Sequence, residues 1–375
     1  MSISSAVLGI ILILVVLGDA FETIIFPRRV TRRIRLTRLF YRYTWKLWSG
    51  LVTSLSSGRP QENYLSFYGP LSLLLLLVLW ATGLIVGFGL LLWAMGATRE
   101  AGFGTSLYLS GTTFFTLGIG DIVPRTSLGR AVTAVEAGTG FAFLALVIGY
   151  LPALNQSFSR REVNVSLLDA RAGSPPAAAE MLRRHSHDHG IEALQQLLHE
   201  WEGWSAEFLE SHLSYPVLAY FRSQHDNQSW LAALTTILDT CALVIVGLEG
   251  ACARQAELTF AIARHAIADL SIVFSSPPTE PEEDRLPPSD LAYLRSTLAA
   301  AGLRLREGDE ADQRLAELRR MYEPYAYSLS KYLCITMPSW ISKADHTDNW
   351  QTTAWGKIPG LGGSGKSDGL GDRHF

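Results

Sequence analysis

An apolar run without a single charged side chain extends from Pro70 to Met95 of this 375-residue chain. At ~1.5 Å per helical residue, such a run exceeds the ~30 Å hydrocarbon core of a bilayer. Ile3–Phe26 and about Leu128–Leu154 are apolar segments of similar length. The sequence therefore predicts three membrane spans, the second beginning near Tyr64. A cleaved signal peptide is the alternative for the first span, although no basic residue precedes Ile3.

Between the second and third spans lies the hexapeptide Thr116–Asp121, which reads T-L-G-I-G-D. Gly118 and Gly120 lack a Cβ and can take positive φ, so successive carbonyls can point toward one axis. Non-helical backbone at membrane depth is tolerated only where it is buried in protein or lines a water-filled path. The pattern predicts a short helix over Thr105–Phe115, followed by a loop that returns to the surface from which the segment entered.

The hexapeptide resembles the T-V-G-Y-G-D filter of potassium channels, and the resemblance covers about Thr105–Ala153. In that family, backbone carbonyls replace the water around the ion. The resemblance implies a tetramer, because one loop supplies a quarter of the carbonyl ring, and potassium ions in the filter with no other metal or cofactor. It places a gating hinge at Gly140. The implied ion-binding residues are Thr116, Leu117, Gly118, Ile119 and Gly120.

Three positions depart from the family pattern. Leu117 and Ile119 replace the usual Val and Tyr, and Phe115 stands where a second Thr is common. The missing Tyr hydroxyl removes a brace behind the filter. A weakly selective cation pore is therefore the alternative to a potassium-selective one, and a chance hexapeptide is the alternative to a filter.

Four residues are predicted to support the filter: Tyr108, Thr112, Asp121 and Glu136. Tyr108 is placed to donate a hydrogen bond to Asp121, and Thr112 stands where many family members carry a Glu. Glu136 lies two turns into the third span, where a carboxylate that faces lipid is costly. We expect it to pack toward the short helix and accept a hydrogen bond from Thr or Ser, with direct ion contact as the alternative.

Basic residues crowd the loop between the first two spans, and no acidic residue occurs from Pro27 to Gln61. Cytoplasmic loops carry such an excess of Lys and Arg. We therefore expect a multi-pass protein of the plasma (inner) membrane with an external amino terminus and a cytoplasmic carboxyl terminus. Asp19 and Glu22 are expected to form interfacial ion pairs near Arg28.

The basic residues of Arg28–Lys46 recur with apolar ones between them. This pattern predicts an amphipathic helix on the inner membrane surface, in contact with anionic lipid headgroups. A voltage-sensor helix is the alternative. The aromatic residues expected at the headgroups are Tyr41, Tyr43, Trp45 and Trp48.

Helical apolar spacing follows Arg161, and few strand signals occur there. Ser174-Pro175-Pro176 is expected to begin a helix. Leu231–Leu248 approaches spanning length, but Asp239 lies in its middle, so a buried core helix is expected and a fourth span is the alternative. The other expected helices are Ile191–His212, Ser229–Gly247, Cys252–Val273, Ser289–Ala301 and Asp312–Cys334.

The expected fold class is an all-α membrane protein with four parts. Residues 1–62 hold the first span and the basic helix, residues 63–156 the pore domain, residues 157–346 a helical cytoplasmic domain, and residues 347–375 a disordered Gly-rich tail. No dinucleotide-binding pattern occurs in the second half, and the formal P-loop match Gly360–Ser367 has no strand before it. We expect neither an enzyme nor a nucleic-acid partner.

The helical domain is expected to modulate the pore, and its sequence does not identify a regulatory ligand. A membrane-anchored scaffold with a vestigial pore is the alternative from another class. Histidines could hold a metal or sense acid, although we expect solvated side chains. They are His185, His187, His189, His199, His212 and His225, with Asp188 beside the first three. The three cysteines are far apart and predict neither a disulfide nor a zinc site.

Overall fold

The computed structural model describes residues 3–26, 35–98, 102–187, 189–342, 348–353 and 356–357. The chain divides into two compact units. The first, the membrane unit, comprises Met1–Gln156 together with Val217–Phe221, and the second, the helical domain, comprises Ser157–Pro216 with Arg222–Phe375. Both are helical, and the described strands are the two-residue pair β1 (Thr352–Thr353) and β2 (Gly356–Lys357). The expected all-α membrane fold is confirmed.

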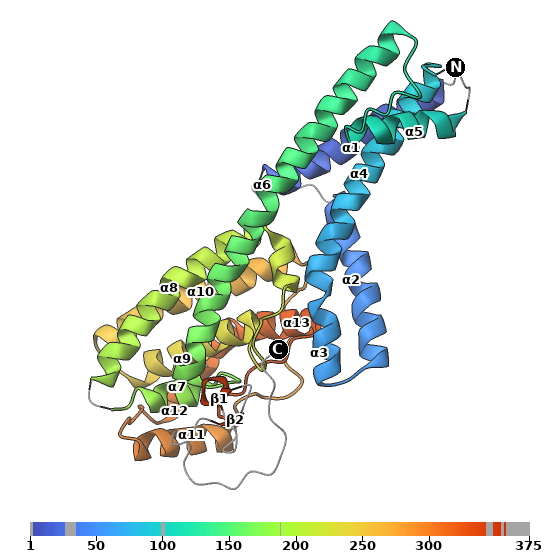
Figure 1. Cartoon of the computed structure of the whole chain (residues 1–375). Helices are drawn as coiled ribbons and strands as arrows, with labels where there is room; N and C mark the ends of the chain where they lie inside the picture. The colour runs from blue at the N-terminus through green and yellow to red at the C-terminus, as the bar shows by residue number, and fades with distance from the viewer. Residues whose placement is uncertain are drawn as a thin grey trace. The chain divides into compact units, whose positions relative to one another are not determined.

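Six helices build the membrane unit, and their order along the chain can be followed in Figure 1. By length and composition, α1, the run Pro60–Ala94 and α6 are each able to cross a membrane. These are the three spans that hydropathy predicts. The helices are α1 (Ile3–Ile24), α2 (Leu36–Leu55), α3 (Arg59–Ser66), α4 (Tyr68–Ala94), α5 (Phe103–Phe114) and α6 (Ser127–Ala172), the last of which continues into the helical domain.

Glycines let α1 and α4 pack closely. A Cβ at Gly9 would lie 2.6 Å from the Gly87 carbonyl oxygen, and a Cβ at Gly87 would lie 2.7 Å from Ile13. Gly83 and Gly87 are one turn apart, the spacing with which small residues bring membrane helices together. Buried Trp80 adds a polar contact, because its indole nitrogen donates to Asp19 at 2.9 Å.

Asp19 and Glu22 connect α1 to the start of α2. The Asp19 carboxylate accepts hydrogen bonds from the backbone nitrogen of Thr37 at 3.1 Å and from its hydroxyl at 2.5 Å. Glu22 forms an ion pair with Arg35 at 3.4 Å. Among the described residues, Glu22 has the kind of charged partner that we expected, while the described partners of Asp19 are neutral donors. Arg28, the predicted partner, lies outside the described residues.

The expectation of headgroup aromatics on α2 is wrong for two of the four side chains. Trp45 is buried, and its ring centroid lies 4.8 Å from that of Tyr68 at the start of α4. Tyr41 packs against the apolar cluster formed by α1 and α4. Trp48 bonds the carbonyl oxygen of Tyr64, so α2 runs beside α3 and the start of α4. Only Tyr43 is largely exposed.

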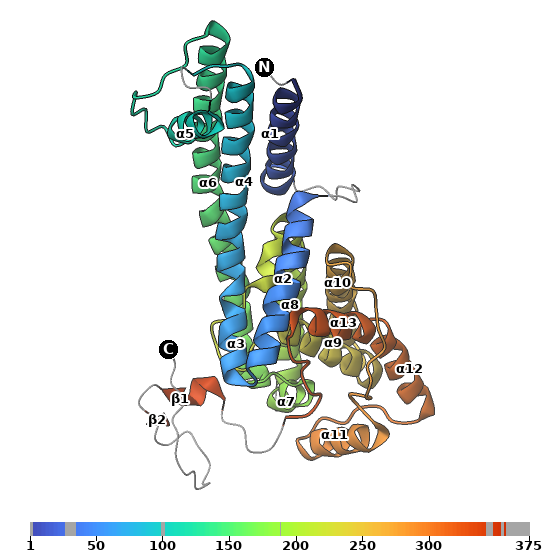
Figure 2. The ribbon, with the colours of Figure 1, turned by 90° about the vertical axis from the view of Figure 1, so that its right-hand side faces the viewer.

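The short helix α5 crosses the direction of α4 and α6, since Figure 2 shows it nearly end-on while the two long helices are seen along their length. It packs against α4 where Gly89 leaves room, because a Cβ there would lie 3.3 Å from the Leu107 Cα. Phe114, at the end of α5, is buried beside Phe143 of α6. The chain therefore folds as span, short helix, loop and span.

The helical domain is built around α8, α9 and α10, and the described helices that begin within it are labelled in Figure 1. α9 is apolar enough to cross a membrane, but 89% of its apolar window is buried inside the protein, and Asp239 pairs with Arg285. It is a core helix. The helices are α7 (Ala178–Arg184), α8 (Gly190–Ser214), α9 (Trp230–Gly247), α10 (Ala251–Val273), α11 (Pro288–Ala300), α12 (Asp309–Arg320) and α13 (Glu323–Leu333), with the 3₁₀ turn η2 (Asn349–Gln351). The other 3₁₀ turn, η1 (Pro216–Tyr220), belongs to the membrane unit from Val217 onward.

Three expectations for this half need correction. The helix expected at Ser174 begins only at Ala178, because Ser174 lies in a turn and its nitrogen donates to Asp348. The helix expected over Asp312–Cys334 is two helices, and Pro324 stands in the first turn of the second. The described start of the Gly-rich tail forms η2 and the two short strands, while Gly360–Ser367 lies outside the described residues.

Candidate ion-conduction site

The loop after α5 has an alternating backbone. Thr116, Gly118 and Gly120 have φ values of +56°, +56° and +81°, and the residues between them do not share this left-handed conformation. The positive φ that the sequence requires of both glycines is therefore found. Alternation of this kind brings successive carbonyl groups to the same side of the chain, which is the arrangement that a ring of ion-coordinating oxygens needs.

The carbonyl oxygens of this loop are not used by the fold. Within the part of the chain that the structure describes, no hydrogen bond ends on the carbonyl oxygen of Thr116, Leu117, Gly118 or Ile119. Residues 116–119 are exposed in the single chain, so these oxygens are open to a ligand from outside the chain. Four consecutive unengaged oxygens therefore form a set of hard ligands that suits a cation without bound water.

Thr112 supports the loop through its backbone. Its carbonyl oxygen accepts hydrogen bonds from the nitrogens of Leu117, at 2.8 Å, and Gly118, at 3.4 Å. Its hydroxyl is occupied by the Leu109 carbonyl oxygen at 3.0 Å. The predicted support residue thus lies against the filter segment, but its backbone, and not its side chain, makes the contact.

Tyr108 and Asp121 come together as the sequence predicts. The Tyr108 hydroxyl lies near enough to the Asp121 carboxylate for the two side chains to interact, and the hydrogen bond between them stays a prediction. The same carboxylate accepts the backbone nitrogen of Ile122 at 2.9 Å. The role of this pair in conduction also stays a prediction.

Glu136 packs against α5 and is fully buried. Ser110 donates to its Oε1 atom and also lies 2.7 Å from the Ile85 carbonyl oxygen of α4. Among the described residues, Oε2 of Glu136 has no hydrogen-bond partner. The expected packing against the short helix is found, with Ser110 as the hydroxyl that sequence reasoning left open.

Gly140 has a packing role that its assignment as a hinge did not include. A Cβ at this position would lie 2.0 Å from the Phe114 carbonyl oxygen at the end of α5, whereas a Cβ at Gly138 would meet no atom within 4 Å. α6 is helical through both positions. Gly140 therefore allows α6 to contact Phe114 at the end of α5, just before the loop Thr116–Asp121. The hinge role of Gly140 stays a prediction.

We expect Gly140→Ala to lower the free energy of unfolding by about 1–3 kcal/mol, because overpacking forces backbone apart. Gly138→Ala is the matched control, and it should be neutral or stabilising by up to ~1 kcal/mol, since Ala favours a helix over Gly. Thermal unfolding of both variants in detergent measures the difference. Equal midpoints for the two variants would contradict the close contact.

The histidines do not gather around a common point. Among the described residues, no three His, Cys, Asp or Glu side chains are placed to share a metal ion. Two of the six are also not solvated, because His185 and His212 are buried. Asp188 lies outside the described residues. The expectation of solvated side chains is therefore wrong for these two histidines.

His212 is held neutral in the folded helical domain. Its Nδ1 atom lies 2.8 Å from the Phe208 carbonyl oxygen, and its ring packs against the rings of Phe208 and Trp230. Burial, and to a lesser extent the positive charge of Arg161, hold the pKa of His212 well below its usual value near 6.5. Protonation would place a charge where the fold provides little solvation.

Stability should consequently fall as pH drops below about 6.5, because the unfolded chain then binds a proton that the folded chain does not. The loss contributed by this group approaches about 1.4 kcal/mol per pH unit until the folded pKa is reached. His212→Gln should remove this contribution, while exposed His225→Gln should not. The measurement is the unfolding midpoint of each variant at pH 7.5 and at pH 5.5. If His212→Gln and His225→Gln showed the same pH dependence, buried His212 would not be the group responsible.

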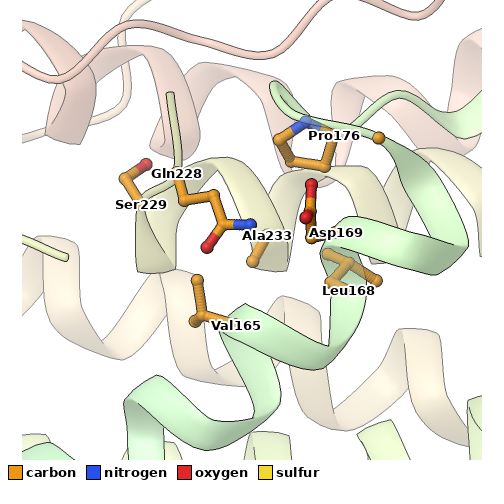
Figure 3. A pocket seen from close by; sticks show the side chains of 8 residues that line it. Val165, Leu168, Asp169, Pro176, Gln228, Ser229 and Ala233 are labelled. Carbon is orange, nitrogen blue, oxygen red and sulfur yellow. The ribbon is translucent and has the colours of Figure 1, made fainter. Parts of the chain in front are cut away.

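A pocket in the helical domain, shown in Figure 3, lies at the end of α6 and the start of α9. It has no room for a water-sized molecule. Asp169 is its one titratable side chain, and Ser229 serves as the N-cap of α9. The set holds no paired nucleophile and base. Its lining residues are Val165, Leu168, Asp169, Gly173, Pro176, Gln228, Ser229 and Ala233.

Two long helices joined by a short re-entrant helix and a loop of unengaged carbonyls define the pore domain of an ion channel. Residues 73–156 match the family model described as "Ion channel", so this part of the chain is similar to the pore domains of ion channels. The chain is also 24% identical over 244 residues to the "Uncharacterized membrane protein YdjJ" of Bacillus subtilis (strain 168), across 62% of this chain and 69% of that protein. No solved structure matches the chain.

Sequence reasoning missed three features that position this site. The contact between Gly140 and Phe114 has no local signal, because it joins two helices. The spacing of Gly83 and Gly87 was a readable signal for the α1–α4 contact. The hydrogen bond from Ser110 to Ile85 could not be found from either residue alone.

Proposed function

We propose that four copies of the chain form a potassium-selective channel in which the backbone carbonyls of Thr116–Ile119 coordinate dehydrated ions. The observation that carries the proposal is the row of unengaged carbonyls on an alternating backbone. One chain supplies a single strand of such oxygens, while a dehydrated ion needs oxygens on all sides. A closed ring of four chains meets that need.

Apolar side chains that are exposed in the single chain support assembly of several copies. Only 11% of the apolar window of α6 is buried, and Phe141 and Ile148 on this helix are largely exposed. Leu117 and Ile119 of the filter segment are exposed by 63% and 59%. Side chains behind a filter need support from neighbours, because a loop that moves freely does not hold ions in a fixed geometry. We infer that neighbouring subunits cover these residues.

The experiment is ion flux into liposomes that contain the purified full-length chain. We expect potassium to move down its gradient, and reversal potentials in mixed potassium and sodium to favour potassium. Equal permeability to both ions would favour the weakly selective pore, for which the loss of the Tyr hydroxyl at Ile119 is the specific reason. Absence of any flux from a correctly assembled protein would favour a scaffold with a vestigial pore.

The orientation follows from the charge of the first loop. We propose an external amino terminus and a cytoplasmic carboxyl terminus in the plasma (inner) membrane. Three spans place the two ends on opposite sides, and reporter fusions at both ends measure this. Finding the ends on one side would contradict the three-span arrangement.

Lipid contact is proposed for the start of α2. Arg38, Arg42 and Lys46 are exposed and one turn apart, so they form a basic stripe on this helix. Such a stripe attracts anionic headgroups. Replacing all three by Gln should lower the amount of anionic lipid that co-purifies with the protein, and unchanged lipid retention would refute this contact.

We propose that the helical domain modulates the pore and does no chemistry of its own. A channel that lacks the residues after Arg161 should still conduct but should respond differently to cytoplasmic conditions. Loss of assembly in that truncated protein would instead make the domain a tetramerisation module.

A further inference from the structure

The described start of the tail, residues 348–351, packs against other parts of the helical domain and is called the tail segment below. Its first residue, Asp348, is only 6% exposed. The Oδ2 atom of Asp348 accepts a hydrogen bond from Arg184 of α7 at 2.6 Å, and Oδ1 accepts one from the backbone nitrogen of Ser174 at 3.2 Å. Burial of a carboxylate is costly unless such donors satisfy it. Asp348 is therefore the anchor of the tail segment.

The two residues after Asp348 are bound through polar groups as well. The backbone nitrogen of Trp350 donates to Oδ2 of Asp169 at 2.9 Å. The side-chain amide of Asn349 donates to the carbonyl oxygen of Asp226 at 2.9 Å, and its backbone nitrogen lies 3.4 Å from the Ser174 hydroxyl. Three consecutive residues of the tail segment thus each have a partner outside it, as in the recognition of a short peptide.

Arg184 is held in place by groups that do not belong to the tail. Its Nε atom donates to Glu180 at 2.6 Å, and Nη1 donates to two carbonyl oxygens near the end of α6 at 3.2 and 2.7 Å. Arg183 donates to the same Glu180 carboxylate at 2.6 Å. Two guanidinium groups therefore share one carboxylate, which leaves Arg184 able to bind a second one. A fixed guanidinium is a suitable receptor for an acidic side chain.

The backbone opposite Asp348 also leaves room for it. Gly173 has a φ of +87°, and a Cβ at this position would lie 3.2 Å from Oδ1 of Asp348. A side chain at position 173 would therefore crowd the carboxylate. The glycine lets Asp348 approach the chain closely between α6 and α7.

The connection to the tail segment is short. Five residues separate Ser342 from Asp348 along the chain. A segment on such a connection docks at an effective concentration in the millimolar range, so even weak contacts keep its site filled. The contacts themselves involve residues 348–350 alone, and a separate peptide with the same sequence can make them too.

We propose that Asp169, Ser174, Arg184 and Asp226 form a binding site for short acidic peptides of the type Asp-Asn-Trp-Gln, which the chain fills with its own tail segment. The tail is an exchangeable occupant. A partner protein that presents such a segment takes the site by competition and releases the tail. Neither the site nor its occupant requires the proposed channel function.

Fluorescence anisotropy with the full-length chain in detergent tests the site. The probe is an acetylated, fluorescent peptide of residues 348–353. Asp348→Lys places a second positive charge opposite Arg184 and should expel the chain's own tail. We expect this variant to bind the probe at least about tenfold more tightly than the parent, because in the parent the tethered tail competes. Equal affinity of the two chains, or no binding to Asp348→Lys, would overturn the proposal.

Two changes test the anchor. A probe that carries Asp348→Asn should bind the Asp348→Lys chain at least about tenfold more weakly, since a hydrogen bond to a charged group is lost. This change leaves the protein unaltered, so misfolding cannot produce the effect. Adding Arg184→Gln to the Asp348→Lys chain should weaken the normal probe to a similar degree. Undiminished binding of the Asn probe would overturn Asp348 as the recognised residue.

The matched control is Arg314→Gln in the Asp348→Lys chain. Arg314 lies on α12 and forms an ion pair with Glu317 at 3.1 Å, and both side chains are at least 40% exposed. This substitution removes the same charge without touching the site, so probe affinity should not change. An equal loss of affinity with Arg314→Gln and Arg184→Gln would mean that overall charge attracts the probe, which would overturn the site.

Hydrogen exchange gives a readout without a label. The backbone amide of Ser174 donates to Asp348 in the parent, so its exchange should be faster in Asp348→Lys. Excess unlabelled peptide of residues 348–353 should slow it again toward the parental rate. Parental exchange at Ser174 in Asp348→Lys, or exchange that the peptide does not slow, would overturn the proposal.

Discussion

Gly118→Ala should reduce potassium flux by at least about a hundredfold without preventing assembly. Gly118 has φ +56°, and a Cβ there would meet no atom within 4 Å in its own chain. The cost is therefore backbone strain and not crowding. It is ~1–2 kcal/mol for each left-handed residue, and four subunits would bear it together in the proposed ring. Since each 1.4 kcal/mol changes an equilibrium constant tenfold, only a small fraction of the channels would adopt the conducting backbone geometry.

Gly104→Ala is the control for this prediction. Gly104 also lies in the re-entrant segment, on α5, and a Cβ added there would likewise meet no atom within 4 Å, but its φ is not positive. This variant should conduct like the parent. Size-exclusion chromatography of both variants checks assembly, and liposome flux checks conduction. If Gly118→Ala conducted and selected like the parent, Thr116–Asp121 would not be the filter.

Asp239→Asn should destabilise the helical domain by about 3–5 kcal/mol, the range measured when one partner of a buried ion pair is removed. Asp239 is fully buried, and both of its oxygens accept from Arg285, at 2.7 and 3.3 Å. Tyr322 donates to the same carboxylate. The substitution keeps the shape of the side chain but leaves the Arg285 guanidinium with less compensation.

Glu257→Gln supplies the comparison. Its ion pair with Arg254 has a similar length, 2.7 Å, but both side chains are at least half exposed, so the cost should stay under about 1 kcal/mol. Denaturant unfolding of the two variants in detergent gives the difference directly. Similar losses of stability would mean that the pair in α9 is solvated and that α9 is not the core helix described above.

The pore segment was readable from sequence because its requirements are local. Glycine is required at position 118 because the backbone of that residue has positive φ, and the lengths of the three apolar spans follow from the thickness of a bilayer. Asp239 in the middle of an apolar helix was a local signal too, since a charge in such a place needs a buried partner or water. These expectations depend on residue type and spacing alone.

Which residues contact one another across different helices was decided by the tertiary structure. Ser110 as the donor to Glu136, Phe114 against Gly140 and the inward turn of Trp45 each join residues from different helices, and many pairings satisfy the same periodicity. The docking of Val217–Phe221 on the membrane unit is the clearest case. The sequence of this segment does not distinguish it from an ordinary loop. Its position is set by the packing of the Tyr220 ring against the aromatic rings of α2 and α4. Sequence by itself determined where the chain crosses the membrane and where its backbone must be left-handed, because those are properties of single segments; the contacts that brace the pore depend on shape and could be decided only by packing.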